Sequence, residues 1–277
     1  MSYFINGSFV SEEAAKISVL DLGLLRGFGI FEYLRTYRSR PFHLEEHLER
    51  LRHSAAHLRI PLSYELSDII HKLIDQEMQK SISECGIKII ITGGVSSDQF
   101  MPQNTPSCIA FAYPHIPYPS HPNGIHIVST SFQRALPHCK TTQYLSAIAA
   151  LQGTSAQEAL YITPQGELLE ATTSNFFAVK QGVLYTSDSP LLLRGITRAL
   201  VLRLAEHLNI PTSFAPLFIQ DIPHCDEAFI TATNKEVLPV ATIDQIPLKI
   251  GPVTQRLKEA FRAYTQQSQW DSIKLFN

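Results

Sequence analysis

The most informative segment of the chain reads Leu191-Leu-Leu-Arg-Gly-Ile-Thr-Arg-Ala-Leu200. A glycine followed by Ile196 and Thr197 opens an amphipathic helical pattern that continues to Leu208. The first N–H groups of a helix have no partner within it, and the helix dipole adds partial positive charge there. The segment therefore predicts a helix whose start either binds a phosphate, with the Thr197 hydroxyl as a further donor, or is a plain N-terminal cap.

Two isolated charged residues precede this helix. Lys140 lies in the uncharged stretch Pro137–Tyr144, where partial burial would lower the pKa of the amine and free it for a Schiff base; a surface lysine is the alternative. Glu170 follows two leucines and precedes a β-like run, and a buried acid needs a cationic partner. A lysine, an acid for a pyridinium nitrogen and a phosphate-binding helix start are together what a pyridoxal phosphate site requires.

A possible metal motif lies near the N-terminus. The segment His43-Leu-Glu-Glu-His47 matches the inverted zinc-peptidase pattern, in which two histidines four residues apart on a helix share a metal. Pro41 places the helix start near His43, so this histidine falls in or before the first turn. Because no later helix offers an obvious third ligand, we expect an ordinary helix start and no metal.

Composition sets the class of protein. The chain has 277 residues, 44% of them hydrophobic, with 23 Lys and Arg against 25 Asp and Glu, which is typical of a globular protein. The near-neutral charge gives no basic field for nucleic acid, and no apolar run reaches the roughly 20 residues of a membrane span. The four cysteines stand far apart without a CxxC motif, as reduced thiols do. We expect a cytoplasmic protein with neither nucleic acid nor membrane as a partner.

Proline marks the expected domain boundary. Residues 114–124 contain four prolines in eleven positions, which predicts an extended, stiff linker between an N-terminal domain (1–113) and a larger C-terminal domain (125–277) carrying Lys140. Strand and helix patterns mix in both halves, which predicts an α+β fold. The clearest expected elements are strands at 30–37, 86–91, 108–113, 125–131, 158–162, 175–179 and 228–232, and helices at 44–58 and 196–208.

Taken in order, these segments resemble the fold-type IV pyridoxal-phosphate enzymes, which include branched-chain and D-amino-acid aminotransferases and aminodeoxychorismate lyase. The resemblance covers nearly the whole chain and rests on the segments 21–32, 40–55, 140–145, 170–177, 194–198 and 227–233. It implies a two-domain α+β fold with the active site in the interdomain cleft, a homodimer, and pyridoxal 5′-phosphate as the cofactor.

The resemblance also implies individual roles. Lys140 would form the Schiff base and move the proton between the substrate Cα and C4′ of the cofactor, while Glu170 would pair with the pyridinium nitrogen. Tyr144 is similar to the tyrosine that some members place against the ring hydroxyl, although Gln143 replaces a common asparagine. The residues that would hold the phosphate are Arg50, Ile196, Thr197 and Thr233.

The substrate end of the pattern departs from part of the family. Members that act on D-amino acids or aminodeoxychorismate carry an arginine shortly after the Ile-Thr strand end, whereas residues 91–100 have none and carry Asp98. Arg26 stands where aminotransferases commonly have an aromatic residue, so we expect it to grip the substrate carboxylate; an exposed loop arginine is the alternative. Phe31 and Tyr33 are expected to line the same pocket and to favour apolar substrates.

The sequence therefore predicts a class IV aminotransferase that transfers an amino group from an apolar, branched-chain amino acid to a 2-oxo acid. The alternative is 4-amino-4-deoxychorismate lyase, which would release pyruvate and p-aminobenzoate with the same lysine. A cofactor-binding protein without turnover is a third interpretation, disfavoured because such a protein would not need the base at Lys140.

Overall fold

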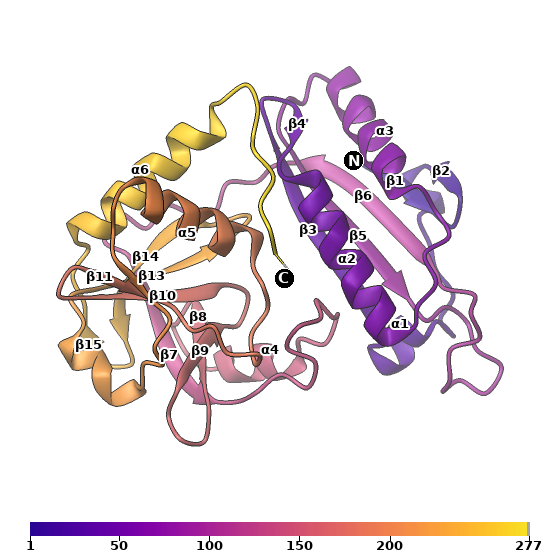
Figure 1. Ribbon diagram of the computed structural model, residues 1–277. Helices are drawn as coiled ribbons and strands as arrows, with labels where there is room; N and C mark the ends of the chain where they lie inside the picture. The colour runs from indigo at the N-terminus through magenta and orange to yellow at the C-terminus, as the bar shows by residue number, and fades with distance from the viewer. Residues whose placement is uncertain (276–277) are drawn as a thin grey trace. The chain divides into compact units, whose positions relative to one another are not determined.

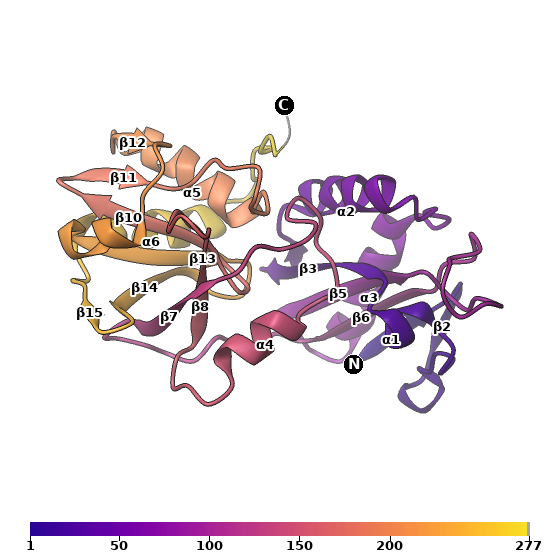
Figure 2. The same cartoon turned by 90° about the horizontal axis from the view of Figure 1, so that it is seen from below.

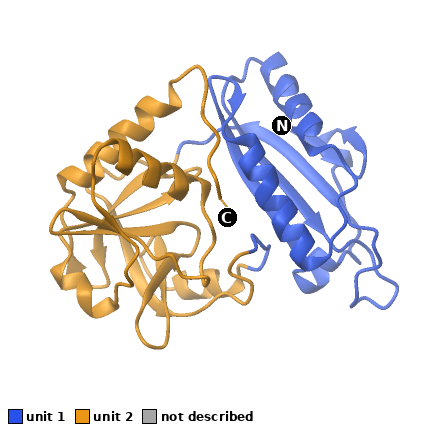
Figure 3. Cartoon of the chain, in the orientation of Figure 1, with its two compact units in different colours: residues 1–117, 139–143 blue, residues 118–138, 144–277 orange. Residues whose placement is uncertain are grey.

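The computed structural model describes residues 1–275 and divides the chain into two compact units (Figures 1 and 3). The first unit consists of Met1–Pro117 together with Cys139–Gln143, and the second of Tyr118–His138 together with the chain from Tyr144 onward. Lys140 thus belongs to the first unit, whereas the proline-rich segment of the sequence predicts that it belongs to the C-terminal domain. The reason is backbone pairing, because Thr141 forms an antiparallel bridge with Ile30.

The first unit is built on a six-stranded antiparallel sheet in the order β2-β1-β6-β5-β3-β4. An Asn6-Gly7 turn with positive φ at both residues joins the first two strands, as the hairpin pattern requires. The strands are β1 (Ser2–Ile5), β2 (Ser8–Val10), β3 (Gly29–Tyr37), β4 (Arg40–Pro41), β5 (Cys85–Thr92) and β6 (Cys108–Pro114).

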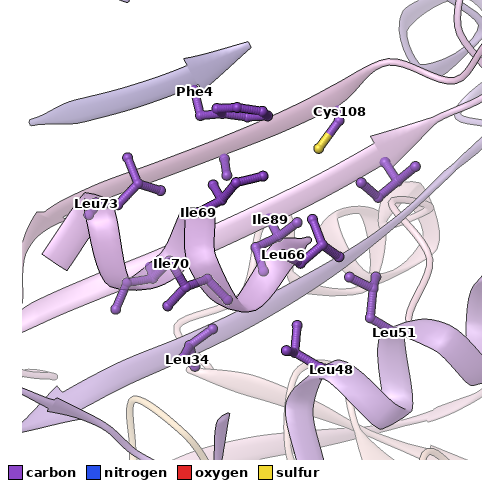
Figure 4. Packing of buried hydrophobic residues seen from close by; sticks show 14 of the residues in the cluster. Phe4, Leu34, Leu48, Leu51, Leu66, Ile69, Ile70, Leu73, Ile89 and Cys108 are labelled. Carbon is purple, nitrogen blue, oxygen red and sulfur yellow. The ribbon is translucent and has the colours of Figure 1, made fainter. Parts of the chain in front are cut away.

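Two long helices cover one face of this sheet, α2 (Leu44–Leu58) and α3 (Leu66–Gln79). Figure 2 shows α2 lying along the sheet, and Figure 4 shows leucines and isoleucines of both helices packed with those of the strands. The shorter helices of the unit are η1 (Glu12–Ala14) and α1 (Leu22–Arg26). Because side chains alternate along a strand, this packing leaves the opposite face of the sheet to the odd-numbered residues of β3.

The second unit is built on a nine-stranded mixed sheet in the order β12-β11-β10-β13-β14-β7-β8-β9, with β15 paired to β14. A further pairing between β9 and β10 closes six of these strands into a ring. The strands are β7 (Ile125–Ser131), β8 (Glu158–Ile162), β9 (Leu168–Ala171), β10 (Asn175–Lys180), β11 (Val183–Tyr185), β12 (Thr212–Ser213), β13 (Glu227–Ala232), β14 (Glu236–Ile243) and β15 (Ile246–Pro247).

Helices α5 (Ile196–His207) and α6 (Pro252–Thr265) pack against each other and against β13 and β14. The buried rings of Phe177 on β10 and Phe229 on β13, which lie opposite each other in that strand pair, stack with their centroids 4.8 Å apart. The unit also contains α4 (Leu145–Leu151) and η2 (Ile219–His224). The α+β class is confirmed, and the α2 pattern matches the observed helix from end to end. Within residues 1–275, no helix is both long and apolar enough to cross a bilayer.

Candidate active site

Lys140 lies beside strand β3 in the first unit. The amide of Phe31 donates to the Lys140 carbonyl at 2.9 Å, and Thr142 N donates to Gly29 O at 2.9 Å, so the lysine segment continues the sheet past β3. Lys140 is therefore the cross-strand partner of Phe31, and its Nζ lies 4.7 Å from the centroid of that ring. The lysine is half-buried, and its backbone is fixed by the bond to its own carbonyl and by the bond of the Thr142 amide.

Helix α2 is tied to the lysine by a serine. Ser54 is fully buried; its hydroxyl donates to the Arg50 carbonyl at 3.0 Å and accepts from the Lys140 amide at 3.2 Å. One hydroxyl thus fixes the backbone of the lysine relative to the helix turn that carries Arg50.

Arg50 is oriented by a buried carboxylate. Its Nε and Nη2 donate to the two oxygens of Glu32 at 2.7 and 2.8 Å, and His47 Nδ1 lies 2.8 Å from Glu32 Oε2. Burial disfavours the charged form of Glu32, yet the charge and hydrogen bonds of Arg50, with the His47 hydrogen bond, outweigh burial and lower its pKa to about 2. Burial also lowers the pKa of His47, so the neutral ring donates from Nδ1 to the carboxylate.

The structure also explains the HxxEH motif. His43 precedes the first turn of α2 in a left-handed conformation, and its Nδ1 lies 3.2 Å from Glu46 Oε1. His47 bonds to Glu32, so both histidines have carboxylate partners within the protein. The motif is a helix start in which His47 belongs to the buried network around Arg50 and His43 pairs with Glu46.

In the second unit, Glu170 is buried on β9 and held from three directions. Its Oε2 accepts from the Leu193 amide at 3.0 Å and from Asn175 Nδ2 at 3.4 Å, and Arg134 Nη1 lies 3.3 Å from Oε1. Asn175 also donates to the Leu193 carbonyl at 2.9 Å. These bonds place the Glu170 carboxylate next to the loop that leads into α5.

The start of α5 has the geometry expected of an anion site. Ile196 and Thr197 form its first turn and are buried, so their amides are directed by a fixed backbone. Gly195 is the N-cap, and a Cβ atom there would clash with Asn175 Oδ1. The glycine therefore allows the helix start to approach the side chain that holds Glu170.

The remaining predicted residues occupy separate positions. Tyr144 is the half-buried N-cap of α4, and Thr233 follows the end of β13. Phe31 and Tyr33 lie on the face of the first sheet opposite α2 and α3, where burial and then Tyr113 raise the pKa of Tyr33. Arg26 is exposed at the end of α1 and donates to the Leu25 carbonyl at 3.1 Å; its role as a carboxylate clamp stays a prediction.

Asp98, which occupies the place of the expected arginine, organises its own loop. Its Oδ1 accepts from Ser96 Oγ at 2.6 Å and from the amides of Phe100 and Met101, both at 2.9 Å. The Ser96 hydrogen bond, followed by these two amides, lowers the pKa of the carboxyl. The loop therefore carries a hydrogen-bonded carboxylate at the place where the members that act on D-amino acids or aminodeoxychorismate carry an arginine.

Comparison with known proteins identifies the family. The family model for class IV aminotransferases matches residues 29–243. A putative branched-chain-amino-acid aminotransferase from Methanocaldococcus jannaschii is 34% identical over 276 residues, which cover 95% of this chain and 96% of that protein. A D-alanine aminotransferase from Staphylococcus aureus is 33% identical over 278 residues, which cover 95% of this chain and 97% of that protein.

Solved structures of aminotransferases have the same fold as this chain. A branched-chain amino acid aminotransferase from Escherichia coli superposes with a TM-score of 0.87 at 27% identity, covering 99% of both chains. The T.th. branched-chain enzyme with pyridoxamine 5′-phosphate gives a TM-score of 0.85 at 28% identity, covering 95% of this chain and 93% of that one. The chain belongs to the class IV aminotransferase family. It is an aminotransferase, and enzymes of this class use pyridoxal 5′-phosphate.

The residues of this chain fit that cofactor. Taken by itself, the first unit carries a half-buried lysine and a buried arginine; taken by itself, the second carries a buried carboxylate and a helix start with Thr197 in its first turn. The hydroxyl of Thr231, which lies opposite Asn175 in the β10–β13 pair, is buried and has no hydrogen-bond partner in the described part of the chain. A polar ligand at this strand end would satisfy such a hydroxyl.

The residues that hold the predicted site residues in position were not predicted from the sequence. Glu32 carried a signal, because an acid alternates with Ile30 and Leu34 on the buried face of a strand and must have a partner. Ser54, Arg134 and Asn175 carried none, since their partners lie 86, 36 and 5 residues away along the chain.

Proposed function

We propose that this aminotransferase takes the amino group of an apolar, branched-chain amino acid and transfers it to a 2-oxo acid. The observation that carries the proposal is the surface beside Lys140. Its cross-strand partner is Phe31, and the next side chain of β3 on that face is Tyr33. Aromatic rings next to the reacting amine favour an apolar substrate side chain over a small polar one.

The residues of the chain divide the chemistry between them. Pyridoxal 5′-phosphate supplies the electron sink that makes the Cα proton of an amino acid removable. Lys140 would bond the cofactor through Nζ and then move that proton, while Glu170 would hold a proton on the ring nitrogen. Arg50, the Ile196 and Thr197 amides and Thr233 would bind the phosphate, and Tyr144 the ring hydroxyl. Arg26 stays the proposed carboxylate clamp.

The Asp98 loop supports an L-amino acid as the donor. Its hydrogen-bonded carboxylate would repel a substrate carboxylate, so this loop is unsuited to the grip that we associate with D-amino acids and aminodeoxychorismate. For the same reason aminodeoxychorismate lyase is the less favoured of the two functions. The absorption experiment described below distinguishes it from an aminotransferase.

We also propose a cytoplasmic homodimer. Four free cysteines support a reducing compartment, and exposed apolar residues on each unit support burial against a second copy. Leu24 and Phe100 are each 65% exposed in the first unit, and Leu145 is 82% exposed in the second. Light scattering coupled to gel filtration measures the mass directly; a monomer at micromolar concentration would contradict the dimer.

The deciding experiment follows the visible absorption of the purified, cofactor-loaded protein as single amino acids are added. Loss of the visible band with L-leucine but not D-alanine, with 2-oxo acid formed, would support the proposal. Loss with D-alanine alone would reverse the stereochemistry, and turnover of aminodeoxychorismate alone would establish the lyase. Lys140→Ala should lack the band shift altogether, with activity reduced by about 10²- to 10⁴-fold or more.

A further inference from the structure

A groove follows one side of α5 in the second unit. Its volume is about 770 Å³, within the range of roughly 300–1,000 Å³ that small-molecule sites occupy. The helix contributes residues at three- and four-residue intervals, as one face of a helix does. They are Gly195, Arg198, Ala199, Leu202, Arg203 and Glu206. Ile196 and Thr197 belong to the buried face of α5 and do not line the groove. The groove and the two amides proposed for the cofactor phosphate therefore use different faces of one helix.

Two other segments of the same unit complete the groove. One follows β12 and carries the exposed ring of Phe214, and the other consists of residues 272–275. The guanidinium of Arg203 pairs with the carboxylate of Asp271 and donates to the Ser272 carbonyl at 3.4 Å. These contacts attach the C-terminal segment to α5, so the groove has a wall on each side of the helix face.

The residues that line the groove carry a net positive charge. Within residues 1–275 the basic ones are Arg194, Arg198, Arg203 and Lys274, and the acidic ones are Asp188 and Glu206. Two arginines share one of these acids, because Arg194 Nη1 pairs with Asp188 Oδ1 and Arg198 Nη2 lies 3.4 Å from the same oxygen. The Asp188 side chain is 50% exposed. One solvated carboxylate thus faces two guanidinium groups near the start of α5.

Arg198 is buried with an incomplete set of partners. The residue is 5% exposed, and its Nε has no hydrogen-bond partner within residues 1–275. Its Nη2 donates to the Ser187 carbonyl at 2.8 Å. Burial lowers the pKa of Arg198, and the opposing effect of Asp188 does not restore it. An anion that brings further acceptor oxygens would stabilise such a guanidinium.

An aromatic ring lies beside this cation. The guanidinium carbon of Arg198 is 6.0 Å from the centroid of the Phe214 ring, and Phe214 is 50% exposed. The exposed ring offers a flat ligand a surface on which to stack, while the neighbouring cation attracts a charged group on the same ligand. Leu202 and Ile210 add apolar lining. The groove therefore combines features that recognise an anion with features that recognise a flat ring.

We propose that this groove binds a phosphomonoester that carries a flat ring, of which a nucleoside monophosphate is the simplest example. The binding site goes beyond the proposed transamination and does not depend on it. A phosphomonoester has a charge of about −1.5 to −2 at pH 7 and three strong acceptor oxygens, which more than one arginine can share. A carboxylate has a single charge and two oxygens in one plane, so it matches two arginines less well.

Ligand binding in the groove also acts on the cofactor through the start of α5. Gly195 and Arg198 line the groove, and the amides of Ile196 and Thr197 between them are those proposed for the cofactor phosphate. An anion bonded to Arg194 and Arg198 restrains the backbone on both sides of these amides, which holds the helix start in its binding conformation. The cofactor should therefore leave the enzyme about fivefold more slowly when the groove is filled. This effect, unlike the site itself, rests on the proposed function of the helix start.

Calorimetric titration of the cofactor-loaded enzyme tests the site, because the cofactor then occupies its own phosphate site. The probe is adenosine 5′-monophosphate, compared with adenosine, which lacks the phosphate, and inorganic phosphate, which lacks the ring. We expect each of these parts to bind about tenfold more weakly than the monophosphate, or weaker still. Equal binding of adenosine would overturn the recognition of an anion, and equal binding of inorganic phosphate would overturn the recognition of a ring. Absence of monophosphate binding at millimolar concentration would overturn the site.

Variants locate the bound monophosphate. Arg194→Gln removes a guanidinium at a partly exposed position and should weaken binding about tenfold or more, as loss of a charge-assisted hydrogen bond does. Arg198→Lys keeps the charge but loses the planar fork, so we expect an intermediate loss. Arg262→Gln, at an exposed position of α6 outside the groove, is the matched control and should leave binding unchanged. Equal weakening by Arg194→Gln and Arg262→Gln would overturn the assignment to this groove.

The effect on the cofactor is measured as the loss of visible absorption when the loaded enzyme is dialysed with and without adenosine 5′-monophosphate. Slower release that disappears in Arg194→Gln supports the coupling, whereas unchanged or faster release in the wild type overturns it. Binding of the monophosphate through Arg194 in a protein that converts no amino acid would keep the site and defeat the proposed function.

Discussion

Glu32 in the first unit and Glu170 in the second are both buried carboxylates with an arginine partner, but the two pairs are built differently. Glu32 is completely buried and takes two hydrogen bonds from Arg50 at 2.7 and 2.8 Å. Glu170 is 4% exposed as a residue, and its contact with Arg134 is 3.3 Å long, from a side chain that is 21% exposed.

The difference indicates two purposes. A short, two-point pair in a buried interior fixes the orientation of the guanidinium, which suits the phosphate-binding role that we propose for Arg50. A longer, partly exposed pair leaves the carboxylate able to share its charge with a second cation, such as a protonated ring nitrogen. We therefore propose that the first pair fixes the position of Arg50, whereas Glu170 of the second pair takes part in the chemistry.

Replacing Glu32 should give the largest effect on folding. Glu32→Ala leaves the Arg50 guanidinium buried without its counter-charge, and breaking a buried pair in this way costs about 3–5 kcal/mol. The free energy of unfolding from urea titration of the cofactor-free protein measures it. Glu49→Ala, at an exposed position on α2, is the control and should stay within about 0.5 kcal/mol of the wild type.

The same titration on Glu170→Ala sharpens the comparison. We expect a smaller loss of unfolding free energy than for Glu32→Ala, because the Arg134 side chain can turn toward water. Equal losses at the two sites would mean that both pairs are structural and that the distinction drawn between them is wrong.

Acid should unfold the first unit through Glu32. Its pKa falls from 4.5 in an unstructured chain to about 2 in the folded protein, so its stabilising contribution is complete above pH 4.5 and disappears as the pH falls toward 2. The corresponding free energy is about 3 kcal/mol. His47 acts in the same direction, because its lowered pKa means that the unfolded chain takes up a proton first.

Unfolding free energies measured between pH 7 and pH 2 test this expectation. The wild type should lose stability steeply over the acid part of that range, and Glu32→Gln should show a flatter dependence with a lower plateau at neutral pH. If the two proteins had parallel pH profiles, the depressed pKa of Glu32 would be refuted.

The same two carboxylates show what could be predicted from sequence. The sequence pattern predicts β3 nearly as observed, and the 3.6-residue period predicts α2 with its observed bounds. Both patterns depend on which side chains are buried. Glu170 was singled out as a lone acid between two leucines and a β-like run, and its role came from resemblance to a family motif. The pairing of Lys140 with β3 was not predicted, since it joins residues more than 100 positions apart and leaves no local pattern.

Glu170→Gln should affect catalysis more than folding. The substitution keeps the shape of the side chain but removes the charge that would hold a proton on the cofactor ring. A hydrogen bond to a charged group contributes about 1.5–3 kcal/mol, so the half-reaction with an amino acid should slow by about 10- to 100-fold. Stopped-flow absorbance measures the rate, and a rate within twofold of the wild type would exclude Glu170 from this role.

Arg134→Gln should have the smallest effect and decides what the longer pair contributes. Arg134 also donates to the carbonyls of Leu136 and Pro137 at 3.1 Å, so it supports the segment leading to Lys140. Because the side chain is partly exposed, loss of its contact with Glu170 should cost about 1 kcal/mol or less, or about fivefold in the half-reaction rate. Arg134→Lys, which keeps the charge, should recover part of this loss. If Arg134→Gln were instead as slow as Glu170→Gln, the arginine would be required for Glu170 to act, and the second pair would be as fixed as the first.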